Sequence, residues 1–89
     1  MTGPSKRQGE LLAFMAAYVE REGMPPTLSE MREYLGTKSP NAALDMLKML
    51  DKKGYVMRKP RASRGTRLTR KAHAFLANQL SEGERQQLG

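Results

Sequence analysis

Positively charged side chains gather in the second half of the chain, where they could bind phosphate groups. The 89 residues include 16 Lys and Arg against 9 Asp and Glu, for a formal net charge of +7. No acid lies between Asp51 and Glu82. A field of one sign attracts polyanions, although a solvated basic surface without a target gives the same pattern. This interval holds the cations Lys52, Lys53, Arg58, Lys59, Arg61, Arg64, Arg67, Arg70 and Lys71.

A second polar group surrounds a predicted helix start. Ser39 can cap a helix that has Pro40 at its first position, where a missing amide does no harm. Free amides and the positive end of the helix dipole could bind a phosphate there, beside Lys38 and the Ser39 hydroxyl. The Asn41 amide could donate to and accept from an adenine edge, or it could bond to local backbone and support the cap.

The residues that follow Asn41 are further candidates for contact with base edges. Ala42 and Leu44 could meet thymine methyl groups, and for Leu44 burial in the core is an equal alternative. Asp45 could accept from cytosine or balance the charge of Lys48. The predicted contacts to a nucleic-acid backbone are Lys38, Ser39, Lys48, Lys52, Arg61, Ser63, Arg64 and Arg67.

Three helices must position these side chains. The first begins at Lys6 after the cap Ser5 and ends at Gly23, before a rigid connector, Met24-Pro25-Pro26. The second begins at Leu28 after the capping box of Thr27 and Glu30, and Gly36 ends it. The third covers 40–53. Because two residues separate Gly36 from Ser39, the second and third helices are predicted to form a helix-turn-helix.

Apolar residues at helical spacing predict which helix faces are buried. The predicted inward residues are Leu11, Leu12, Met15 and Val19 in the first helix, Leu28, Met31 and Leu35 in the second, and Ala43, Leu47 and Leu50 in the third.

The remainder of the chain predicts a wing and a further helix. Two β-prone runs, 55–59 and 66–69, flank a basic loop, 60–65. A helix over 70–80 follows, and a flexible tail is expected over 81–89. Its apolar residues Phe75, Leu76 and Leu80 could pack on the first helix or pair with a second copy. The fold class is therefore mainly α with a small β-hairpin: a winged helix-turn-helix over 1–69 with an additional C-terminal helix.

Composition argues against several classes of function. The chain has no cysteine and a single histidine, His73, so neither thiolate nor clustered imidazole ligands are available. A domain this small has little room for a catalytic cavity. No stretch approaches the roughly 18 apolar residues of a membrane span. We expect a cytoplasmic protein with no metal, no cofactor, no enzymatic activity and no membrane contact.

Three motifs together resemble the DNA-binding domain of the LexA repressor family, over roughly residues 5–68. They are Gly23-Met24-Pro25-Pro26-Thr27, Ser39-Pro40-Asn41-Ala42-Ala43, and Ala62-Ser63-Arg64-Gly65 with Arg67-Leu68; Arg7-Gln8 and Glu10 fit the same pattern. The resemblance implies a winged helix-turn-helix whose third helix enters the major groove, as a dimer on palindromic operators of the SOS response. It carries over Ser39, Asn41 and Ala42 as positions that face the groove.

Two departures from the family pattern bear on function. Leu44 precedes Asp45 where members often have acidic or other polar residues, so the operator sequence is open. Nothing after Leu68 resembles the family's serine-lysine self-cleaving peptidase, which also dimerises these repressors. The chain is either an isolated domain of a larger protein or a complete small regulator, and we expect the latter because the helix pattern after Thr69 does not resemble the family's usual linker. The sequence thus favours a regulator of transcription that binds specific double-stranded DNA, a repressor. A winged-helix module for protein–protein contacts, with a solubilising basic surface, is the alternative.

Overall fold

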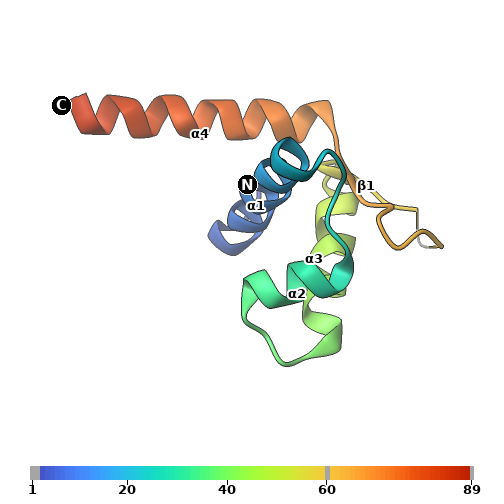
Figure 1. Ribbon diagram of the computed structural model, residues 1–89. Helices are drawn as coiled ribbons and strands as arrows, with labels where there is room; N and C mark the ends of the chain where they lie inside the picture. Colours follow the sequence, from blue (N-terminus) through green and yellow to red (C-terminus); the bar gives the residue numbers. More distant parts are fainter. Residues whose placement is uncertain (1–2, 60, 89) are drawn as a thin grey trace.

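The computed structural model describes the backbone of residues 3–59 and 61–88, and the side chains of these residues except at positions 40 and 80–88. Three helices come first: α1 (Lys6–Glu22), α2 (Leu28–Leu35) and α3 (Pro40–Lys52). A hairpin of β1 (Val56–Met57) and β2 (Arg67–Leu68) and a long helix, α4 (Arg70–Leu88), complete the chain. Figure 1 shows α4 extending away from the other helices, on the side opposite the hairpin loop. This arrangement confirms the predicted winged helix-turn-helix with an additional C-terminal helix.

The first two helices begin and end at the predicted residues because short-range hydrogen bonds fix their ends. Ser5 and Gln8 form a capping box at the start of α1, and Thr27 and Glu30 form another at the start of α2. Gly36 closes α2 with φ of 69°, a left-handed conformation that glycine adopts without steric cost. The chain can therefore turn into α3 through the four residues 36–39.

The start of α3 differs in one respect from the expectation. Ser39 occupies the N-cap position and Pro40 the first turn, as predicted, but the Ser39 hydroxyl makes no capping hydrogen bond. The Ser39 amide instead donates to Thr37 Oγ1 at 3.2 Å. The far end of α3 lies at Lys52, one residue before the predicted end.

The hydrophobic core lies where α1, α2 and α3 meet the hairpin. Its buried residues are Leu11, Leu12, Met15, Met31, Leu35, Ala43, Leu47, Leu50, Tyr55, Val56 and Ala72. Leu28 is only half-buried at its edge. The predicted burial of Val19 is wrong, since this side chain is 40% exposed. Each step of four residues rotates a helix by about 40°, so the row from Leu11 through Met15 has turned away from the core at Val19.

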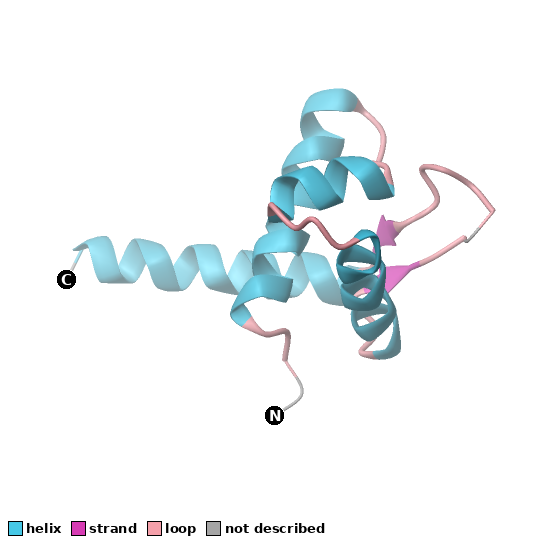
Figure 2. Cartoon of the chain, turned by 90° about the horizontal axis from the view of Figure 1, so that it is seen from below, coloured by secondary structure: helices cyan, strands magenta, loops and turns pink. Residues whose placement is uncertain are grey.

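The hairpin pairs antiparallel, with Val56 opposite Leu68 and Met57 opposite Arg67. Figure 2 shows the two short strands and the loop that joins them. The strands are shorter than the predicted runs, although hydrogen bonds from Thr69 N to Tyr55 O and from Lys59 N to Gly65 O continue the register at both ends. Pro60, in the predicted loop 60–65, lies outside the described residues.

Helix α4 packs on α1 and β2 through its first turns. The Phe75 ring contacts Tyr55 edge-on, with centroids 5.9 Å apart, and a Cβ added at Gly9 would lie 3.4 Å from it. Leu76 also packs against the core. These two dimerisation candidates are therefore used inside the domain, while the Leu80 side chain lies outside the described part. The helix continues to Leu88, so its predicted end at Leu80 is wrong; the flexibility of 81–89 stays a prediction.

Across the described residues, no helix combines the length and the apolar character needed to cross a membrane.

Candidate nucleic-acid interface

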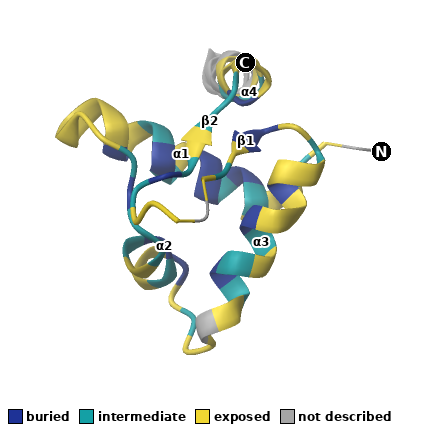
Figure 3. Cartoon of the chain, turned by 90° about the vertical axis from the view of Figure 1, so that its right-hand side faces the viewer, coloured by how far each residue is buried: buried dark blue, intermediate teal, exposed yellow. Residues whose placement is uncertain are grey.

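One face of α3 is polar and turned away from the core. Asn41, Asp45, Lys48 and Lys52 are all exposed, and their spacing of four, three and four residues places them on one side of the helix. Ala43, Leu47 and Leu50 are buried on the opposite side. Figure 3 shows the exposed and buried sides of α3 in yellow and dark blue. The described part of α4 packs on α1 and β2, so it leaves this face of α3 uncovered.

The start of α3 also presents polar groups to the outside. Lys38 and Ser39 are exposed in the turn before it. The Asn41 side chain makes no hydrogen bond to another residue that the structure describes, which argues against the alternative that it supports the cap. Its amide is therefore presented on the outer surface, one position after the proline that begins the helix.

Leu44 and Ala42 occupy the border between the outer face and the core. Both are half-buried. Leu44 lines a cavity of about 100 Å³ between α3 and the wing, together with Leu28 and Leu47 on one side and Ala62 and Ser63 on the other. The sequence allowed Leu44 to face either the DNA or the core. The structure places it between these two positions, where it lines the cavity next to the wing.

The wing presents cations from a tightly closed loop. Arg61, Ser63 and Arg67 are exposed. Inside the loop, Ala62 N donates to Lys59 O at 3.0 Å, and Gly65 N donates to Ala62 O at 3.2 Å. The exposed guanidinium groups of Arg61 and Arg67 are therefore attached to an ordered hairpin.

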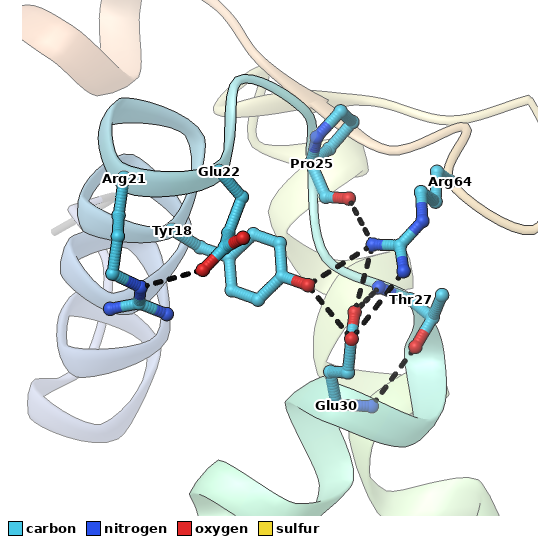
Figure 4. A network of polar contacts seen from close by, with 7 residues as sticks. All are labelled: Tyr18, Arg21, Glu22, Pro25, Thr27, Glu30 and Arg64. Carbon is cyan, nitrogen blue, oxygen red and sulfur yellow. Dashed lines mark hydrogen bonds and ion pairs between the residues drawn. The ribbon is translucent and has the colours of Figure 1, made fainter.

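Arg64 does not lie free on the wing, which corrects the sequence-based expectation. Its Nη1 atom donates to Glu30 Oε1 at 3.0 Å, to the Pro25 carbonyl at 3.0 Å and to the Tyr18 hydroxyl at 3.3 Å. Figure 4 shows the guanidinium pointing from the wing into this group of acceptors. The reason is chemical: a planar fork of donors finds a carboxylate and a carbonyl within reach. Arg64 joins the wing to the helices.

Hydrogen bonds hold the Glu30 carboxyl group in its charged form. The Thr27 backbone amide donates to Oε1 at 2.7 Å, the Tyr18 hydroxyl donates to Oε2 at 2.8 Å, and Arg64 adds its own bonds. The amide of Thr27, then Tyr18, then Arg64 lower the pKa of Glu30 from 4.5 to about 2. The carboxylate is thus more stable in the folded chain than in the unfolded chain.

This lowered pKa predicts a specific loss of stability in acid. Because the folded pKa lies below the unfolded one, Glu30 stabilises the fold fully above pH 4.5, and this contribution is lost as the pH falls from there toward 2. The Glu30→Gln variant lacks this carboxylate, so its free energy of unfolding should fall less than that of the parent as the pH falls from 4.5 toward 2. Urea denaturation at a series of pH values measures this. Glu22→Gln removes the same charge from α1 and should keep the parent's slope; equal slopes for all three proteins would contradict the prediction.

Other cations of the basic run are bound within the domain. Lys53 Nζ donates to Gln8 Oε1 at 3.0 Å and to Gly3 O at 3.3 Å. Lys71 Nζ donates to Lys53 O at 2.8 Å and lies 4.8 Å from the centroid of the Tyr55 ring. These two lysines fasten the end of α3 to its neighbours, so they do not belong to the outer face of α3 or to the wing.

Two cations beside α3 were not among the predicted site residues. Arg58 and Lys59 line the cavity at which Leu44 and the wing meet. The signal in the sequence was their place in the basic run, immediately before the loop. Strand pairing brings them beside α3, and this proximity depends on the hairpin register.

Comparisons with known proteins agree with this geometry. The sequence model of the LexA DNA binding domain matches residues 1–65. LexA repressor 1 of Pseudomonas putida is 50% identical over 62 residues, which cover 70% of this chain and 31% of that protein. The LexA repressors of Pseudomonas chlororaphis and Pseudomonas aeruginosa are 50% and 48% identical over 62 residues. The chain spans less than a third of the length of these curated relatives.

The match confirms the resemblance carried by the three motifs. It extends from the first residue to Gly65 and so includes α1, the helix-turn-helix and the loop of the wing. Since the matched residues make up well over half of the chain, the chain belongs to the LexA DNA-binding domain family.

Proposed function

We propose that this protein is a transcriptional repressor that binds specific sequences in double-stranded DNA. The observation that carries the proposal is the uncovered outer face of α3, which lies beside a wing with exposed cations. A helix of this kind fits the major groove, where base edges differ. The curated relatives are named repressors, and about half of the 62 aligned positions are identical to those of this chain.

The residues of the interface take two roles in this proposal. Base edges are read by Asn41, Ala42, Leu44 and Asp45. The sugar-phosphate backbone is held by Lys38, Ser39, Lys48, Lys52, Arg61, Ser63 and Arg67, to which we add Arg58 and Lys59 from the edge of the wing. Because its guanidinium is occupied within the fold, Arg64 is left out of the backbone contacts.

The repressor acts as a pair of copies on a palindromic site in this proposal, and it works in the cytoplasm without chemistry of its own. A single winged domain covers roughly 600 to 1,000 Å² of surface on DNA, which gives a small interface. Two copies on related half-sites enlarge it. Phe75 and Leu76 pack against the core but are only partly buried, so a second copy could contact their exposed parts as well as other surfaces.

The test is a salt titration of binding to duplex DNA. Site selection from a random duplex pool gives the target, and a mobility-shift assay then measures affinity at several salt concentrations. Each neutralised phosphate contributes a slope of roughly −0.9 in the logarithmic plot. Arg61→Gln should weaken binding and flatten the slope by about one contact.

The matched control is Arg21→Gln, which removes one exposed cation near the end of α1, in an ion pair with Glu22. It should leave the slope at the parent's value. Selection of no duplex, or binding to duplex that ignores salt, would overturn the proposed function and favour a protein partner.

A further inference from the structure

Backbone hydrogen bonds close the loop of the wing on itself. Hydrogen bonds link Lys59 N to Gly65 O, Ala62 N to Lys59 O and Gly65 N to Ala62 O. The turn is tight at Gly65, where an added Cβ would lie 2.5 Å from Lys59 O and 3.0 Å from the Ala62 Cβ. Arg64 is the neighbour of this glycine. An interaction that fixes Arg64 therefore also restrains the closed loop to which it belongs.

The sheet alone is a weak anchor for this loop. Each strand has two residues, and an isolated two-stranded hairpin is marginally stable in water. The base of the hairpin is also packed in the core through Tyr55 and Val56, but residues 61–65 lie beyond this packing, so contacts of the loop itself help to fix its direction.

The Arg64 side chain supplies that anchor. It crosses from the loop to three separate parts of the helical body, namely Tyr18 on α1, the Pro25 carbonyl in the connector and Glu30 on α2. The acceptors are themselves fixed. Glu30 receives the Thr27 amide at its own capping box, and the Tyr18 hydroxyl donates to Glu30. Nη1 lies among all three acceptors, and Nη2 approaches the second carboxylate oxygen, Glu30 Oε2, at 3.5 Å, so the guanidinium faces the carboxylate with both terminal nitrogens.

We propose that Arg64 and Glu30 form a latch that positions the wing for DNA, so that Glu30, an acid, is required for tight binding. The latch holds the exposed Arg61 at the angle from which it reaches a phosphate, and neither latch residue touches DNA. This inference rests on the proposed function and adds a positioning role to it.

The variant Glu30→Gln distinguishes the latch from simple electrostatics, because the two predict opposite changes in affinity for DNA. Glutamine at this position keeps the capping box, as Gln8 does at the start of α1. The variant is one unit more positive than the parent's +7, which by itself would strengthen binding to a polyanion. Loss of the latch should instead weaken binding by roughly two- to fivefold, the upper part of the range for exposed ion pairs.

The variants are compared in the full chain by mobility shift and by amide NMR relaxation without DNA. Arg64→Met should weaken binding as Glu30→Gln does, and the double variant should be no weaker than either. Glu22→Gln, with the same gain of charge, should bind at least as tightly as the parent. In both latch variants, the amides of residues 61–65 should become more mobile on the picosecond to nanosecond timescale.

Three results would decide against the latch or its premise. Glu30→Gln that binds as tightly as Glu22→Gln, while Arg64→Met binds weakly, would mean that Arg64 contacts DNA itself, and the latch would be overturned. Loop amides as rigid in Glu30→Gln as in Glu22→Gln would overturn it whether or not DNA binds. A parent chain that ignores duplex DNA would overturn the proposed function, and the relaxation data would then still decide whether Arg64 and Glu30 fix the loop.

Discussion

Leu47→Ala is expected to lower the free energy of unfolding by about 2 to 5 kcal/mol. Leu47 is 2% exposed on the inner face of α3, where it belongs to the hydrophobic core. Alanine removes three carbons and leaves a cavity that a small domain cannot refill, because its few helices are held by the capping boxes and short turns. Urea denaturation followed by circular dichroism measures the loss.

Met49→Ala is the matched control, since Met49 is a large apolar residue on the same helix but is 47% exposed. Met49→Ala should lower the free energy of unfolding by well under half of the amount expected for Leu47→Ala. Equal losses would mean that the inner and outer faces of α3 are assigned incorrectly. Because native domains are stable by only about 5 to 15 kcal/mol, Leu47→Ala should also abolish DNA binding at raised temperature through partial unfolding.

The helix starts could be predicted because their causes are local. Thr27 and Glu30 are three residues apart, and the bonds between them depend on no distant part of the chain. Local causes also act at Gly36, which adopts the left-handed conformation that ends α2, and at Pro40, whose ring fixes φ at the start of α3. Neighbouring residues therefore determine the turn between α2 and α3. This turn in part sets the orientation of the outer face of α3.

The role of Arg64 could not be predicted from such intervals. Its partners lie 34 to 46 positions away, and an arginine in a basic loop has the same local pattern whether it faces a phosphate or a carboxylate of its own chain. Only the packing of α1, α2 and the hairpin brings the acceptors together. The position of Leu44 has the same cause, because helical spacing places it at the border of the core and only the fold brings it to a cavity that the wing also lines.

The outer face of α3 could be predicted from the sequence, and the choice of DNA sequence should depend on this same face. Asn41→Ala is expected to relax the preference at one base position in each half-site, by about 1 to 3 kcal/mol of discrimination. Asn41 is exposed, and in the described structure its amide is not bonded to the cap, so it can donate and accept at one adenine edge. Site selection with the variant measures the loss, as a flattened base frequency at that position.

Lys48→Ala separates this effect from a general loss of affinity. Lys48 lies two turns further along the same exposed face, and an ammonium group binds a phosphate without reference to the neighbouring base. Removal of this ammonium group should weaken binding to all DNA sequences about equally. It should reduce the slope of affinity against salt concentration by about one phosphate contact and leave the selected base frequencies unchanged. If Asn41→Ala selects sites as sharply as the parent, or if Lys48→Ala changes the selected sequence, then α3 enters the groove in a different rotation, and Asp45 or Leu44 reads the base instead.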